Sequence, residues 1–196
     1  MSQKCCLAAP DAPRALPSSV ISLLIDLFPG PLRSYGEAVV LAGPIAQGTA
    51  HLPVAGLGTP AIDTALDAAL RIMARHYDGT DRRVVASVWA RHYFSALLPA
   101  PLAALALRHH ALPLDRAICV VDEHGIPTQL QVPHPGETQY HASASARFDG
   151  LLEHHLRPLI ETLSRVSGVS ARLLWANAGA VTAEVFRHAR RDLAAD

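Results

Sequence analysis

Residues 87–107, SVWARHYFSALLPAPLAALAL, carry the highest density of apolar side chains in the chain and decide its fold. Helical spacing gives this region two apolar faces, one with Val85, Val88, Trp89, His92 and Ala96 and another with Phe94 and Leu98. A helix that is apolar on two faces is covered on more than one side, so the sequence predicts a buried central helix. Pro101 suits the first turn of a second helix, where its missing backbone donor has no partner to lose.

The region before the central helix contains two more helical segments. Residues 20–28, VISLLIDLF, predict a short helix that ends at the Pro-Gly-Pro sequence of residues 29–31. Residues 60–77 predict a longer one, because proline occupies the first turn and apolar side chains recur every three or four residues. Between these helices, residues 38–41 and 52–57 are apolar and fit either short strands or irregular packed loops.

After the central helix, the spacing of apolar residues changes from the helical pattern to the short runs typical of strands. Residues 115–121 and 126–132 are short apolar runs joined by Asp-Glu-His-Gly, which predicts a β-hairpin whose Gly125 adopts the left-handed conformation. Residues 133–145 have the composition of a loop. From Phe148 a long helical stripe follows, and Pro158 implies either a kink or a second helix that starts near Arg157.

The last helix begins after Ser170 and carries basic residues near its end, where the helix dipole favours them. Together these segments predict an α+β fold: a predominantly helical single domain over residues 18–196, with a small antiparallel sheet built on the 115–132 hairpin. Residues 1–17 are rich in alanine and proline, and we expect them to form a poorly ordered tail.

Composition excludes several classes of function. Seventeen basic and seventeen acidic residues cancel, so no overall field attracts nucleic acid or an anionic membrane. The longest uncharged apolar run, residues 94–107, is too short to span a bilayer. The N-terminus lacks the basic start and apolar core of a signal peptide, so we expect a cytoplasmic protein.

Metal and nucleophile motifs have little support. The 11 histidines include no pair three or four residues apart, the spacing that would place two rings on one helical face. The three cysteines, Cys5, Cys6 and Cys119, have neither the number nor the spacing of a closed metal site. Walker loops, serine nucleophile elbows and HExxH sequences are absent. We therefore expect no protein-bound metal from these residues.

Polar side chains inside apolar helices are the remaining candidates for a binding site. Asn177 lies two residues after Trp175 in a helix of small apolar residues, and it serves either as a hydrogen-bonded core residue or as part of a ligand pocket. His92 and Tyr93 pose the same question on the central helix. Arg91 requires an acidic partner or an anionic ligand.

These segments, in this order, resemble the ferric iron reductase family of the FhuF type. The resemblance covers about residues 60–187. It rests on the Trp89 helix with LLPAPLAALAL, the DEHGIPTQLQV hairpin, the long amphipathic helix, and LLWANAGA with Trp175, Asn177 and Ala178. It implies a protein that releases iron from imported ferric siderophores by reduction in the cytoplasm, with an electron donor protein as a partner.

The same resemblance implies a 2Fe-2S cluster held by four cysteines near the C-terminus, as a CC pair followed by CxxC. The sequence has no cysteine after Cys119, so this ligand set has no counterpart here and we expect no cluster in this chain alone. Three hypotheses remain: a reductase whose cluster is supplied elsewhere, a cluster-free siderophore-binding accessory protein, and a helical interaction module without redox activity.

If the resemblance holds, the siderophore binds in a cleft between the central helix, the 133–145 loop and the Trp175 helix. A bulky, polar ferric complex requires convergent donors and aromatic walls. The side chains that supply them in this hypothesis are Arg91, His92, Tyr93, His134, Tyr140, His141, Trp175 and Asn177.

Overall fold

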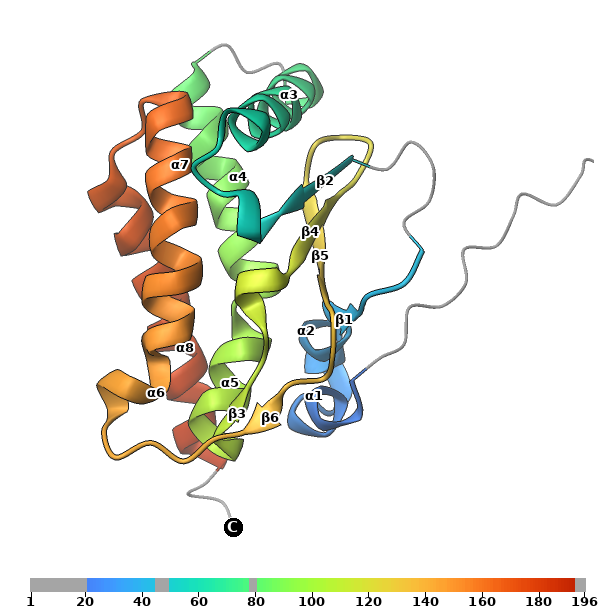
Figure 1. The fold of residues 1–196 in the computed structure, drawn as a ribbon, viewed down its shortest axis with the longest axis vertical. Coiled ribbons are helices and arrows are strands. Elements are labelled where there is room, and N and C mark those ends of the chain that lie inside the picture. Colours follow the sequence, from blue (N-terminus) through green and yellow to red (C-terminus); the bar gives the residue numbers. More distant parts are fainter. Residues whose placement is uncertain (1–20, 45–49, 78–80, 193–196) are drawn as a thin grey trace, which may run out of the picture.

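The computed structural model describes residues 21–44, 50–77 and 81–192, with side chains as far as residue 187. The longer helices gather on one side of a small sheet, as Figure 1 shows. The α-helices are α1 (Ser22–Leu27), α2 (Arg33–Glu37), α3 (Pro60–His76), α4 (Arg82–Leu97), α5 (Pro99–Arg108), α6 (Ala144–Leu151), α7 (Arg157–Ser167) and α8 (Ala171–Asp192). The strands are β1 (Val39–Leu41), β2 (Ala50–Pro53), β3 (His110–Ala111), β4 (Ile118–Val121), β5 (Pro127–Val132) and β6 (Glu137–Thr138). The tail expected over residues 1–17 lies outside the described residues.

Helix α4 is the centre of the fold, as predicted. It packs against α3, α7, α8 and β5, so it is covered on several sides. Its buried side chains are Val85, Ala86, Trp89, Ala90, Tyr93, Phe94 and Leu97. The buried face is rotated from the predicted one, because Val88, His92 and Ala96 are only half-buried and line a surface depression. Helix α5 follows after Leu98, with Pro99 and Pro101 in its first turn.

The predicted hairpin is formed by β4 and β5. In its turn, one carboxylate oxygen of Asp122 accepts hydrogen bonds from the backbone amides of His124 (2.9 Å) and Ile126 (2.8 Å). Gly125 has φ +80°, and a Cβ atom there would lie 2.4 Å from the carbonyl oxygen of Ala69 in α3. The turn can therefore pack against α3 only because this residue is glycine.

The sheet is larger than the hairpin and is mixed rather than purely antiparallel. Its strand order is β1-β5-β4-β2, with β1 parallel to β5 and β2 antiparallel to β4. The backbone amides of Leu130 and Ala42 donate to the carbonyls of Ala38 and Val132. Residues 38–41 are therefore a strand, and residues 52–57 combine the end of β2 with a 3-10 turn, η2 (Val54–Gly56). A separate two-stranded sheet pairs β3 with β6.

The backbone stays helical from Leu151 through Arg157, so the region around Pro158 is one helical path whose type of helix changes just before the proline. Helix α6 runs into a π-helical segment, η4 (Leu152–Leu156), and α7 begins at Arg157 with Pro158 in its first turn. Helix α8 then packs against α4, α5 and α7. The chain thus has the predicted α+β, mostly helical fold.

Candidate functional site

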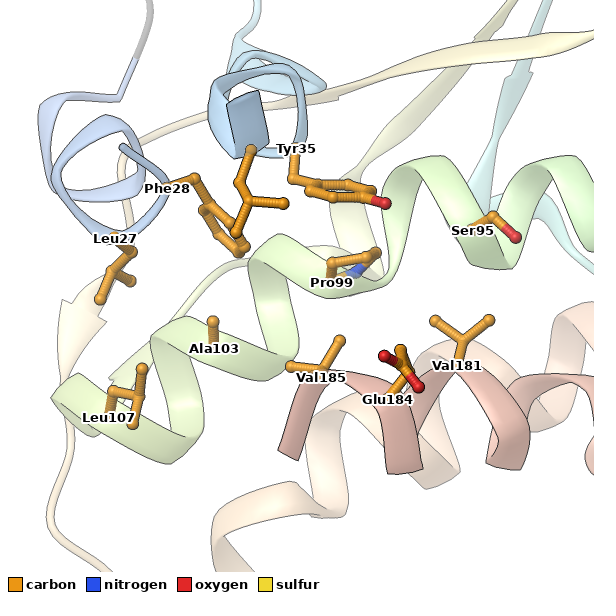
Figure 2. A pocket seen from close by; sticks show the side chains of 11 residues that line it. Leu27, Phe28, Tyr35, Ser95, Pro99, Ala103, Leu107, Val181, Glu184 and Val185 are labelled. Atoms are coloured by element: carbon orange, nitrogen blue, oxygen red, sulfur yellow. The ribbon is translucent and has the colours of Figure 1, made fainter. Parts of the chain in front are cut away.

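A groove with two lobes lies between α1 and α2 on one side and α4, α5 and α8 on the other. The first, here called the apolar lobe, has a volume of about 220 Å³. Its walls are Leu27, Phe28, Leu32, Tyr35, Ser95, Pro99, Ala103, Leu107, Val181, Glu184 and Val185. Figure 2 shows Phe28 and Tyr35 facing Pro99, with Val181 and Val185 of α8 along the opposite side.

The second, here called the polar lobe, is a wider and shallower depression of about 870 Å³. Its walls are Ser34, Tyr35, Glu37, Ala38, Tyr77, Val88, Arg91, His92, Ser95, Ala96, Pro127 and Thr128. These residues come from α2, the end of α3, the outer face of α4 and the start of β5. Because Tyr35 and Ser95 line both lobes, the two lobes adjoin at these side chains, and they are together called the groove.

The close packing of α1 on α2 positions the aromatic side chains at this junction. Gly36 lies so near the backbone of α1 that a Cβ atom there would be 2.7 Å from the carbonyl oxygen of Leu24. The neighbouring Tyr35 ring packs on Phe28 with ring centroids 5.8 Å apart. The small residue at position 36 thus places Tyr35 between the lobes.

The two lobes differ in their charged side chains and in the ion pairs that these side chains form. In the polar lobe, Arg91 is exposed and forms no ion pair within the described part of the chain. Glu37 pairs with Arg33 at 2.7 Å, whereas Glu184 of the apolar lobe pairs with Arg187. His92 approaches the hydroxyl of Tyr77, with 3.4 Å between Nε2 and Oη. The polar lobe therefore combines an uncommitted guanidinium with imidazole and phenol groups, a set suited to an oxygen-rich, anionic ligand.

The predicted site residues are not brought together in one place. Arg91 and His92 line the polar lobe, as two members of the expected set. Tyr93 is buried and donates its hydroxyl proton to Nε2 of His155 at 2.8 Å. It therefore faces the core and lines neither lobe of the groove.

The remaining candidates lie in two other regions. His134 is exposed and its Nδ1 accepts from the backbone amide of Gly136, while Tyr140 is 82% exposed beside the ring of His109. His141 is half-buried in the same 133–143 segment, which runs along the end of the molecule where α8 finishes (Figure 1). Trp175 and Asn177, both half-buried, stand near the start of α8 instead. These five residues line neither lobe of the groove.

The groove residues that the sequence did not indicate are mainly Tyr35, Tyr77, Ser95 and Val185. Each is unremarkable in its local sequence, and each joins the groove because separate helices meet there. The one signal in the sequence was the position of Arg91 and His92 as polar groups on an otherwise apolar helix.

Tyr93 and His155 form a buried polar link between α4, η4 and the loop before β4. If His155 carries its proton on Nδ1, it donates to the carbonyl oxygen of Leu114 (3.3 Å) and accepts from Tyr93 on Nε2. Burial lowers the pKa of His155 from 6.5 to about 4, although the Leu114 carbonyl opposes this shift. Burial, and then the nearby Cys119, raise the pKa of Tyr93 well above its usual range. Both groups are therefore neutral near pH 7.

The described cysteine does not fit a cluster ligand. Cys119 is fully buried in β4, and burial raises the pKa of its thiol, whereas iron–sulfur ligands are thiolates. Cys5 and Cys6 lie outside the described residues. Within the described ranges, no group of three or more histidine, cysteine, aspartate or glutamate side chains is arranged to hold a metal ion.

No helix in the described part of the chain is both long and apolar enough to cross a membrane.

Comparison with known proteins gives one family. The search of curated proteins finds no match. The family model described as "Ferric iron reductase FhuF-like transporter" matches residues 87–196, which include α5, α6, α7, α8 and most of α4. Because this match spans more than half of the sequence, the chain belongs to the FhuF-like ferric iron reductase family.

Proposed function

We propose that the chain binds a ferric siderophore in the groove and takes part in releasing its iron by reduction in the cytoplasm. Family membership supports the iron chemistry. The observation that supports this binding site is the position of Arg91. Its exposed guanidinium forms no ion pair among the described residues and lines a depression of about 870 Å³. Pockets for ligands of drug size or larger typically have volumes of about 300 to 1,000 Å³.

The polar lobe suits the outer surface of a ferric chelate. Iron in a siderophore is enclosed by oxygen atoms, so a protein recognises the complex through its periphery rather than by ligating the metal. Arg91 donates to chelate oxygens, and His92 and Tyr77 supply further polar contacts. The ring of Tyr35 provides an aromatic wall.

Release of iron requires one electron. Fe(III) accepts it and becomes Fe(II), which oxygen-rich chelators hold less tightly, while a separate electron donor protein is oxidised by one electron. This donor is a separate protein and not part of this chain. The chain's own residues hold the chelate so that one side remains accessible in the shallow polar lobe.

A siderophore-binding accessory protein is the second candidate function. It is favoured by one observation, that Cys119 is a buried thiol unsuited to ligate a cluster. The two functions separate in one assay, in which a soluble one-electron donor and a chromogenic Fe(II) chelator report iron release. Acceleration by the protein supports the reductase role, and binding without acceleration supports the accessory role.

Calorimetry with ferric hydroxamate, catecholate and citrate-type complexes tests the binding site. Arg91→Gln is expected to weaken binding about tenfold or more, because a charge-assisted hydrogen bond contributes about 1.5 to 3 kcal/mol. Arg172→Gln is the matched control, since Arg172 is exposed on α8 and lines neither lobe. Absence of binding by all three classes at millimolar concentration contradicts the proposal.

The same experiment compares the groove with the site first expected from the sequence. His134, Tyr140, His141, Trp175 and Asn177 remain proposed contacts for a ligand outside the groove. If Asn177→Ala weakens binding while Arg91→Gln does not, the ligand binds near the start of α8, outside both lobes, and the groove assignment is wrong.

A further inference from the structure

We infer that the ligand of this groove is amphiphilic, with a polar ferric chelate in the polar lobe and an aliphatic tail in the apolar lobe. This inference rests on the proposed function for the chelate. It adds a second chemical group to the ligand and assigns that group its own part of the groove.

The first argument is the chemistry of the apolar lobe. Leucine, valine, alanine, proline and phenylalanine side chains form most of its walls, and hydroxyls come only from Tyr35 and Ser95 at the junction with the polar lobe. No basic side chain lines it. An aliphatic group gains free energy by leaving water for such a surface, whereas a polar chelate would lose its hydration without compensation.

The second argument is the order of charges. Arg91 stands in the polar lobe, and the acidic Glu184 stands in the apolar lobe beside Val181 and Val185, as Figure 2 shows for the latter three residues. Each lobe has one carboxylate, Glu37 in the polar lobe and Glu184 in the apolar lobe, and each pairs with an arginine. The charge that distinguishes the lobes is therefore Arg91, which attracts an anionic or oxygen-rich head. An amphiphile can therefore lie in the groove in only one direction, with its tail towards Leu107.

The third argument is continuity and size. Tyr35 and Ser95 border both lobes, so head and tail can occupy them at once. A volume of about 220 Å³ holds on the order of seven groups of about 30 Å³ each, close to the size of a water molecule. An acyl chain of about eight carbons, whose groups are of similar size, matches this space.

The test compares two ferric complexes with the same head. A linear ferric trihydroxamate whose terminal amine is acetylated is matched with its octanoylated form, and both are titrated calorimetrically into the full chain below the aggregation concentration of the ligand. Both forms carry the same charge, so any difference reports the tail. Burial of only two of the six extra methylene groups is expected to tighten binding about tenfold.

Variants locate the tail. Leu107→Glu places a carboxylate in the apolar lobe at a side chain that is 36% exposed, and it is expected to abolish the affinity advantage of the octanoyl complex over the acetyl complex. Leu152→Glu is the matched control, because Leu152 is 38% exposed and lines neither lobe. Should Leu107→Glu fail to fold, Val185→Phe fills the lobe without adding charge and is expected to have the same effect.

Each result decides the question. Equal affinity for the two complexes overturns the amphiphilic ligand while the proposed siderophore function stands. Failure of both complexes to bind overturns this inference for hydroxamates, and the catecholate and citrate-type complexes then decide whether the proposed function stands. An octanoyl advantage that persists in Leu107→Glu and Val185→Phe places the tail elsewhere and overturns the assignment. A wild-type dimer that Leu107→Glu dissociates identifies a second copy as the occupant and also overturns it.

Discussion

His155 is expected to make the stability of this protein fall steeply in mild acid. The folded chain keeps its imidazole neutral between the Tyr93 hydroxyl (2.8 Å) and the Leu114 carbonyl (3.3 Å), with almost no exposed surface. Its pKa is about 4 in the folded chain, compared with 6.5 for an exposed histidine. Protonation would put a charge in the core and remove the acceptor for Tyr93.

The sign and size follow from proton linkage. Between pH 6.5 and 4 the unfolded chain binds a proton at this residue and the folded chain does not, so the free energy of unfolding decreases as the pH falls. The full loss is about 3 to 4 kcal/mol, because the pKa falls from 6.5 to about 4 and each unit corresponds to about 1.4 kcal/mol, and about 2 kcal/mol of the loss is reached at pH 5.

Urea unfolding at pH 7.5 and pH 5 measures this loss when wild type and His155→Gln are compared. Other titrating groups contribute equally to both proteins, so the stability advantage of wild type over the variant should shrink by about 2 kcal/mol at the lower pH. His154→Gln, at the exposed neighbouring residue, is the control. The stability difference between wild type and this variant should change by less than about 0.5 kcal/mol between pH 7.5 and pH 5. A wild-type advantage over His155→Gln that does not depend on pH would refute the reasoning.

Three further predictions concern the core. Tyr93→Phe leaves Nε2 of His155 without its donor and should lower the free energy of unfolding by about 1 to 3 kcal/mol in urea titrations at pH 7.5; an unchanged midpoint would contradict the hydrogen bond. Gly125→Ala should lower the melting temperature clearly, because residue 125 has φ +80° and its Cβ would lie 2.4 Å from the carbonyl oxygen of Ala69 in α3. An unchanged melting temperature would show that α3 can move away to accommodate the methyl group. In a Cys5→Ser, Cys6→Ser variant, Cys119 should react with a thiol reagent only on unfolding, since it is buried with a raised pKa, and rapid modification of the folded chain would disprove this.

Local patterns were sufficient to predict most helices. Pro60 begins α3, and the apolar density of residues 87–107 identifies α4 and α5 as the buried centre. Gly125 also marked the hairpin turn correctly, because a glycine that closes a short polar link between two apolar runs is typical of a hairpin. These features depend on interactions within a few residues of one another, so the sequence reports them directly.

The residues that line the groove were predicted only in part. Arg91 and His92 were identified because polar groups on an apolar helix need polar partners or a ligand, and both line the polar lobe. Tyr93 was grouped with them, yet successive residues on a helix point about 100° apart, and this rotation turns Tyr93 towards His155. The apolar lobe was not predicted, since Tyr35 and Val185 are 150 residues apart and ordinary in their local context.

By itself, the sequence determined most of the helices and the hairpin turn, since proline, glycine and apolar spacing act through local backbone geometry. It missed α2, and it placed the start of α6 at Phe148 and the start of β4 at Asp115, whereas these elements begin at Ala144 and Ile118. Only the tertiary structure decided that β1 joins β5 in parallel, that His155 meets Tyr93, and that α1, α2 and α8 enclose a groove with α4 and α5. The physical reason is that burial removes apolar surface from water without specifying which segments meet. The partners are selected when the whole core packs with its buried polar groups hydrogen-bonded.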